Sequence, residues 1–185
     1  MPIVILVDKN DEKTGYSDLK SAHSGRGKRH RAFVTALFDS KNRLMLQKRK
    51  HKLFNGLWDL TAISHNLRIN GRNESYQEAS DRALKKEMGI QSVTVKKIGA
   101  FNYFARDGAN CENEYCAILV GKYDGEIRPN TKEVSGAKIV SFEDFKKEII
   151  KNPKKFTPWA KIAAEILAEW YKKGLSLTPS RYLPA

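Results

Sequence analysis

Apolar residues in this chain fall into short blocks and spaced stripes that predict an alternation of strands and helices. Continuous or alternating apolar positions predict strands over residues 3–7, 31–38, 44–47, 57–64, 93–103, 114–123 and 138–141. Apolar positions three and four residues apart predict helices over residues 75–88, 142–150 and 159–172. The polar stretches between them are predicted as turns or loops, chiefly residues 8–15, 39–42 and 66–73.

The order of these elements predicts one domain over residues 1–185. It belongs to the α/β (α+β) class, with a mixed sheet and helices on its faces. Residues 31–38 are apolar on both faces, as a central buried strand requires. Residues 1–22 are predicted as an N-terminal strand and extension, and residues 173–185 as a C-terminal tail.

Glu87 is unusual on its predicted helix because it falls on the apolar side. At 100° per residue, it lies three positions after Leu84 and four after Ala83 on the same stripe. A carboxylate on a packed face is costly unless it is paired or bound to a metal. The pattern therefore leaves two interpretations: an acid of a functional site, or an acid at the helix end that reaches water or an arginine.

Acids and histidines gather at the ends of predicted strands. Glu112 and Glu114 begin one strand and project from one face, because residues two apart in a strand lie about 7 Å apart on the same side. His30 precedes a strand, His65 follows another, and His23 lies upstream. Each residue alone is as readily a solvated acid or a hydrogen-bonded histidine. Together, imidazole and carboxylate groups suit zinc, manganese or magnesium.

The net charge of +13 is typical of a soluble protein with lysine-rich helix faces, and it also fits attraction of an anion, either a phosphorylated small molecule or nucleic acid. Nucleic acid binding is better supported by a basic stripe interleaved with aromatic residues. Here the basic residues are spread from Lys9 to Lys173, with local clusters at 26–31 and 48–52. We therefore expect a phosphorylated small molecule as partner and no specific nucleic acid.

The sequence also bears on the compartment. The apolar run over residues 3–7 is far too short to span a bilayer, and no basic leader precedes it. Two cysteines, Cys111 and Cys116, do not make a disulfide framework. We expect a cytoplasmic protein with no membrane partner, and the pattern does not indicate an oligomeric state.

Four short motifs occur in a fixed order along the chain: HRAF, SH, ENE and TPW. With the stretches GLWDLTAISH, ESYQEASDRALKKEMGI and ENEYCAILV, they resemble type 1 isopentenyl-diphosphate isomerase, an enzyme with the Nudix superfamily fold. The resemblance runs from about His23 to Trp159, which is most of the chain. Each motif alone is weak, and their order makes the match specific.

The resemblance implies a divalent metal site. Residues matching the family's ligands are all present: His23, His30, His65, Glu112 and Glu114. The acid that matches Glu87 helps to hold a magnesium ion that bridges to the substrate diphosphate, in agreement with its place on the packed face. Mg²⁺ is the implied ion, with Zn²⁺ or Mn²⁺ as alternatives at the histidine and glutamate site.

The resemblance also implies a reaction, the metal-dependent interconversion of isopentenyl and dimethylallyl diphosphate in isoprenoid biosynthesis. One alkene carbon is protonated, a cation-like centre develops, and a proton leaves from the other side. Glu114 would act as the acid and base on one face, with Tyr103 next to it, and Trp159 would place its indole against the developing cation. The side chains expected to hold the prenyl diphosphate are Lys20, Arg49, Lys52 and Ser64.

One position departs from the family at the centre of this chemistry. The family's catalytic cysteine falls at Ile63, and isoleucine transfers no proton. Asp59 and Leu60 also replace the usual Thr-Asn pair. Cys116 shares the strand face of Glu114, but we interpret it as a core residue. We therefore expect reduced isomerase activity.

Two alternatives remain from the sequence. One is a diverged Nudix hydrolase acting on an organic diphosphate, although Ala83 and Lys86 replace two of the three acids of the hydrolase helix motif. Glu74 and Glu87 would then hold one ion. The other alternative is a catalytically silent diphosphate-binding protein.

Overall fold

The computed structural model describes residues 1–173, so the predicted tail lies outside the described residues apart from Lys173. The strands are β1 Ile3–Val7, β2 Lys13–Asp18, β3 His30–Phe38, β4 Arg43–Arg49, β5 Trp58–Asp59, β6 Ala62–His65, β7 Arg68–Ile69, β8 Arg72–Asn73, β9 Val95–Asp107, β10 Asn110–Lys122 and β11 Val134–Ser141. The helices are α1 Leu19–Ala22, α2 Tyr76–Met88, α3 Phe142–Lys151, the short 3₁₀ helix η1 Pro153–Lys155 and α4 Pro158–Lys172. No helix of residues 1–173 is long and apolar enough to cross a bilayer.

Strand β3 lies at the centre of a nine-stranded mixed sheet. One edge of β3 pairs in parallel with β10 over its whole length. The other edge is divided among three antiparallel partners, first β1, then β6 and finally β4. This division confirms the mixed sheet expected from the sequence, and it brings the beginnings of β3 and β10 and the end of β6 to one place.

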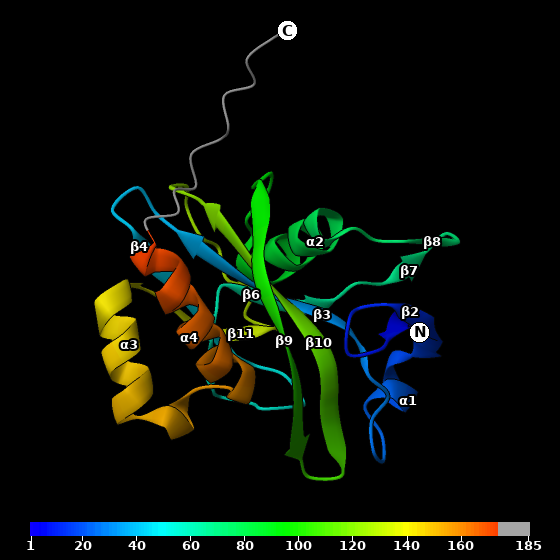
Figure 1. The fold of residues 1–185 in the computed structure, drawn as a ribbon. Coiled ribbons are helices and arrows are strands. Elements are labelled where there is room, and N and C mark those ends of the chain that lie inside the picture. The colour runs from blue at the N-terminus through cyan, green and yellow to red at the C-terminus, as the bar shows by residue number, and fades with distance from the viewer. Residues whose placement is uncertain (174–185) are drawn as a thin grey trace, which may run out of the picture.

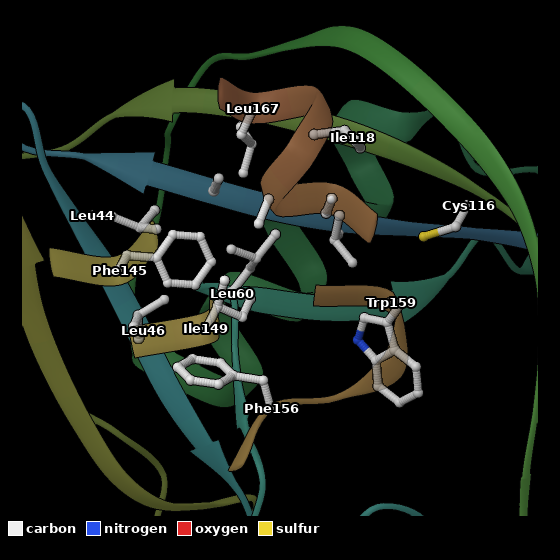
Figure 2. Packing of buried hydrophobic residues seen from close by; sticks show 14 of the residues in the cluster. Leu44, Leu46, Leu60, Cys116, Ile118, Phe145, Ile149, Phe156, Trp159 and Leu167 are labelled. Atoms are coloured by element: carbon white, nitrogen blue, oxygen red, sulfur yellow. The ribbon is translucent and has the colours of Figure 1, made fainter. Parts of the chain in front are cut away.

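Helices cover both faces of the sheet, as predicted, with α2 on one side and α3 and α4 on the other (Figure 1). The larger core lies under α3 and α4, where Phe145, Phe156 and Leu167 pack on sheet residues (Figure 2). Trp159 lies at one end of this cluster and is 1% exposed. The functional residues extend from that end of the core.

Helix α2 follows the predicted bounds because both ends are capped. Ser75 and Glu78 form a reciprocal capping box at its start. Gly89 ends it in a left-handed conformation, with φ of 68°, where a Cβ would meet the Arg128 backbone oxygen at 2.8 Å. Glu87 is buried on the packed face of α2 together with Ala83, as its spacing predicted.

The predicted strand over 57–64 is wrong in one respect, because it divides into β5 and β6. The chain leaves β4 after Asp59 and joins β3 at Ala62. Thr61 occupies the point where β3 and β4 diverge. Its hydroxyl donates to the Met45 carbonyl (2.7 Å) and accepts from the Leu37 amide (2.9 Å), replacing the strand-to-strand hydrogen bonds lost there.

Three predicted loops also contain strands. Residues 8–15 include the start of β2, and residues 66–73 form the β7–β8 hairpin. The predicted loop between residues 103 and 114 is mostly strand, since β9 and β10 extend to a tight turn around Gly108. Polar residues there gain their hydrogen bonds from the neighbouring strand, so tertiary pairing outweighs their low strand propensity.

Candidate metal centre and active site

The five predicted metal ligands lie together at one end of the sheet. His23 directly follows α1, His30 begins β3 and His65 ends β6. Glu112 and Glu114 project from β10, where Glu114 is the register partner of His30. One ligand atom from each residue lies within 4.8 Å of all the others. The structure thus brings together residues from four separate elements.

The Nε2 atoms of the three histidine rings face the middle of this cluster. His30 Nδ1 donates to the Lys28 carbonyl oxygen at 2.8 Å, which orients the ring and turns Nε2 toward the cluster. His23 Nε2 lies 3.2 Å from His30 Nε2, and His65 Nε2 lies 2.9 Å from Glu114 Oε1. Ring nitrogens that converge in this way suit a shared cation.

The carboxylates complete a donor set that fits a divalent ion. Glu112 Oε2 is buried and accepts no hydrogen bond from residues 1–173, although it lies 3.1 Å from His23 Nε2. Burial opposes ionisation of Glu114, but hydrogen bonds from His30 and His65 outweigh it and hold the pKa of that carboxyl well below its usual value. Three imidazole nitrogens and two carboxylates are a donor set for zinc-like and manganese-like ions.

Glu114 also contacts an aromatic wall beside the cluster, formed by Tyr103 and Trp159. The Tyr103 hydroxyl donates to Glu114 Oε2 at 2.5 Å, and Tyr103 is the register partner of Glu114 on β9. The Tyr103 and Trp159 rings are 5.6 Å apart between centroids. Burial raises the pKa of Tyr103 well above its ordinary value, and the charge of Glu114 raises it further, so the phenol stays protonated.

Glu87 and Ile63 lie next to this wall but outside the five-residue cluster. Glu87 Oε2 accepts from Gln47 Nε2 (2.6 Å) and from the Ile63 backbone amide (3.3 Å). Burial raises the Glu87 pKa to about 7. A cation beside the carboxylate would favour its ionised form. The half-buried Ile63 side chain packs against the larger core.

Two adjoining cavities connect these groups with the predicted diphosphate ligands. The deeper cavity, about 170 Å³, is lined by Ile63, Ser64 and Trp159 among others. The outer cavity, about 600 Å³, is lined by Lys20 and Lys52, and its walls include His23 and Glu112 of the metal cluster. Arg49 lines both cavities. Lys20, Lys52 and Arg49 thus line the outer cavity, whereas the inner cavity combines the aromatic rings of Tyr103 and Trp159 with charged side chains.

Comparison with known proteins identifies the fold and the family. The NUDIX domain family matches residues 28–160. An isopentenyl-diphosphate delta-isomerase from Aromatoleum aromaticum is 35% identical over 84% of this chain and 81% of its own length. The corresponding protein of Schizosaccharomyces pombe is 34% identical, over 92% and 83% respectively. This chain belongs to the isopentenyl-diphosphate delta-isomerase family.

Solved structures support the NUDIX fold. A Deinococcus radiodurans protein superposes with a TM-score of 0.67 at 17% identity, covering 91% of this chain and 99% of that one. A MutT protein from Methanosarcina mazei superposes with a TM-score of 0.58 at 16% identity, over 78% and 94%. The predicted fold class is therefore confirmed, and so is the family suggested by the motifs.

Two residues at the site of this isopentenyl-diphosphate delta-isomerase family member, His51 and Asp59, have contacts that the sequence did not reveal. His51, the fourth histidine, lines both cavities and lies 3.7 Å from Glu133. Burial and the charge of Arg49 together lower its pKa to about 4, so the ring is neutral at neutral pH. Asp59 is fully buried against Arg49 and Trp159. In the sequence, this environment is indicated only by the position of a charged residue between the apolar residues Trp58 and Leu60.

The proposed one-ion hydrolase arrangement is wrong about Glu74. Both of its carboxylate oxygens accept from Arg82 at 2.8 Å, and Oε2 also accepts from the Leu67 amide. The carboxylate is thus occupied by an arginine that also donates to the His65 carbonyl oxygen. Glu74 therefore supports the position of His65 rather than a metal.

Neither Cys111 nor Cys116 lines the two cavities of the site. Cys116 is 1% exposed in the larger core, as interpreted from the sequence, and burial raises the pKa of its thiol well above the usual value. Cys111 faces the backbone oxygens of His23 and Gly25 at 3.7 Å. Both thiols are free and buried.

His65→Ala is expected to lower affinity for Zn²⁺ or Mn²⁺ by more than about 100-fold. Loss of a residue that only supports a metal ligand costs about 10–100-fold, and loss of a ligand costs more. The reason is the loss of one of five converging donors. The measurement is metal titration by calorimetry after chelation, with metal content checked by elemental analysis. His51→Ala is the matched control, since His51 lies outside the cluster. Equal metal affinity in wild type and His65→Ala would contradict the assignment.

Proposed function

We propose that this protein interconverts isopentenyl and dimethylallyl diphosphate with the help of a divalent metal. The observation that most supports this is the position of Glu114. It is shared between the five-residue cluster and the aromatic wall, accepting from His65 on one oxygen and from Tyr103 on the other. A carboxylate with this dual contact can exchange a proton with substrate carbon and be returned to its ionised form by its neighbours.

In the proposed reaction, the hydrocarbon part of the substrate occupies the inner cavity. The methylene carbon of the double bond gains a proton, positive charge develops at the tertiary carbon, and the proton at the carbon nearer the diphosphate is lost. Glu114 and Tyr103 serve the face on which they lie. The Trp159 ring lines the same cavity and stabilises the developing charge through its π face.

When bound, the metal supplies positive charge that neutralises the diphosphate and holds Glu114 ionised. His23, His30, His65, Glu112 and Glu114 would hold zinc or manganese, whose ligand preferences include imidazole. Glu87 would help to hold magnesium, an ion that prefers oxygen donors.

Arg49→Ala is expected to weaken pyrophosphate binding by about 1.5–3 kcal/mol, as for loss of a charged hydrogen bond. Arg49 lines both cavities, and its buried Nε has no partner among the described residues. Calorimetry with pyrophosphate in the presence of Mg²⁺ measures the change. Lys41→Ala, in the β3–β4 turn, is the control for charge alone. Unchanged affinity in Arg49→Ala would remove Arg49 from the site.

Ile63 favours a second candidate function, diphosphate binding without catalysis. The residue faces the inner cavity where the family has its catalytic cysteine, and it offers no proton. The hydrolase alternative has less support, because Lys86 and Ala83 leave Glu87 without neighbouring acids on α2 and Glu74 is paired with Arg82.

One incubation separates these functions. Purified protein is mixed with isopentenyl diphosphate, Mg²⁺ and Zn²⁺ or Mn²⁺ in heavy water. Deuterium in recovered dimethylallyl diphosphate indicates isomerisation, and released phosphate or pyrophosphate indicates hydrolysis. Saturable binding with neither product would favour the binding protein. We expect deuterium incorporation at a low rate.

We expect only weak, unspecific binding to nucleic acid despite the +13 charge. Binding should fall steeply with salt, because it rests on released counterions. Fluorescence anisotropy with labelled RNA and DNA at about 0.05 and 0.15 M salt tests this. A submicromolar, sequence-preferring complex at the higher salt would contradict a small-molecule role.

The two free thiols are consistent with the proposed cytoplasmic location.

A further inference from the structure

Asp59 is a buried acid between the two parts of the proposed site, and the proposed reaction gives it no role. It ends β5 opposite Gln47 and is 0% exposed. Its Oδ2 accepts the Trp159 indole N–H at 2.8 Å and the Arg49 Nη1–H at 3.4 Å. Its Oδ1 accepts the Leu60 amide at 2.9 Å. One carboxylate therefore contacts both the aromatic wall and the basic end of the cleft.

Arg49 and Trp159 also contact each other directly. The guanidinium carbon lies 5.0 Å from the Trp159 ring centroid, within the range of a cation–π contact. Arg49 Nη2 donates to the Leu53 carbonyl at 3.4 Å, whereas Nε has no partner among the described residues. Asp59, Arg49 and Trp159 thus form a closed three-residue cluster, which we call the Asp59 cluster.

The charge of Asp59 gives this cluster an electrostatic role in addition to packing. Burial raises its pKa to about 6, against the lowering effects of Arg49, the Leu60 amide and the Trp159 indole. Glu87 and Cys116 are the other titratable groups that influence it or are influenced by it. At neutral pH the carboxylate is mostly ionised. It then supplies Arg49 with a counter-ion inside the protein and holds the indole by a charge-assisted hydrogen bond.

We propose that Asp59 is a positioning residue that fixes the Trp159 ring and the Arg49 guanidinium relative to each other. The inference rests on the proposed isomerase function. It follows that Asp59 competes with the substrate diphosphate for Arg49 while it preorganises the ring that faces the hydrocarbon. The carboxylate therefore weakens diphosphate binding, and in return it fixes the distance between the diphosphate and the reacting carbons.

Asp59→Asn tests this trade because it keeps the shape and removes the charge. Isomerase kcat is expected to fall by about 10–100-fold, as for a misplaced substrate-positioning group. Pyrophosphate affinity is expected to stay the same or increase, because Arg49 is released from its ion pair. Asp124→Asn, an exposed acid beyond the far end of β10 that accepts from the Ser40 amide, is the matched control. Parallel losses of kcat and of pyrophosphate affinity would indicate a structural role and overturn the proposal.

A spectroscopic readout tests the Asp59 cluster without reference to activity. The Trp159 indole N–H resonance, assigned with Trp159→Phe, is expected to shift and to exchange faster with solvent in Asp59→Asn. An unmoved resonance together with wild-type kcat would overturn the proposal. If the wild type shows no isomerisation, the isomerase assignment fails, and the indole resonance still decides whether Asp59 holds Trp159.

The single variant leaves Arg49 buried beside a neutral amide, which is costly. If Asp59→Asn does not fold, Asp59→Asn with Arg49→Gln removes both charges. In that background the indole resonance is expected to shift relative to Arg49→Gln alone. An identical resonance in the two proteins would show that Asp59 does not orient the ring.

Discussion

Glu114→Gln is expected to lower isomerase turnover by at least about 10²–10⁴-fold, the usual contribution of a general acid or base. Glutamine keeps the size of the side chain but cannot exchange a proton with carbon. It also replaces a carboxylate that contacts His65 and lies 3.4 Å from His30. Deuterium incorporation into dimethylallyl diphosphate, followed at saturating metal, measures the loss.

Metal content must be measured in the same samples, since Glu114 is one of the five clustered residues. Glu126→Gln, at an exposed acid that pairs with Arg128, is the matched control for the substitution itself. Turnover at the wild-type rate in fully metal-loaded Glu114→Gln would show that another group moves the proton.

Ile63→Cys is expected to raise isomerase turnover, by up to the about 10²–10⁴-fold that a positioned proton-transfer group contributes. Ile63 lines the inner cavity. Cys116 does not supply a reactive thiol in its place, because burial raises the pKa of the Cys116 thiol and keeps it protonated. The gain is expected to be partial, since Asp59 and Leu60 also differ from the family pattern. The smaller side chain should cost about 1–2 kcal/mol of stability.

Ile63→Ala is the control for the volume removed by the cysteine variant. An equal gain in Ile63→Ala would mean that space, and not the thiol, limits the reaction. Brisk wild-type turnover that Ile63→Cys does not improve would show that another residue replaces the cysteine. Cys116→Ser would then be the next variant to measure.

Much of the fold could be predicted because local patterns and tertiary contacts agree. Helix α2 has its apolar stripe, its capping box and its terminal glycine in one segment, so its bounds follow from the sequence. The segment from Trp58 to His65 could not be read in this way. Its change of partner strand depends on the divergence of β3 and β4, which is set by residues elsewhere in the chain.

The site shows the same contrast. Glu87 was indicated by its place on an apolar stripe, and its burial follows from the same spacing. The gathering of His23, His65 and Glu112 came from family resemblance, because spacing alone did not reveal which strands are neighbours. The contacts of Asp59 with Trp159, 100 positions later in the chain, could not be inferred from either source.

The division of one edge of β3 among β1, β6 and β4 has a consequence for the order of assembly. His65 and Glu114 are 49 positions apart, and they meet only when both β6 and β10 have paired with β3. Long-range pairing of this kind is slow because the chain must close large loops first. An ion bound by these residues would therefore find its full set of ligands only in the nearly native chain. The energy of metal binding would then stabilise the native state more than the folding transition state, so bound metal is expected to slow unfolding and to leave the folding rate largely unchanged.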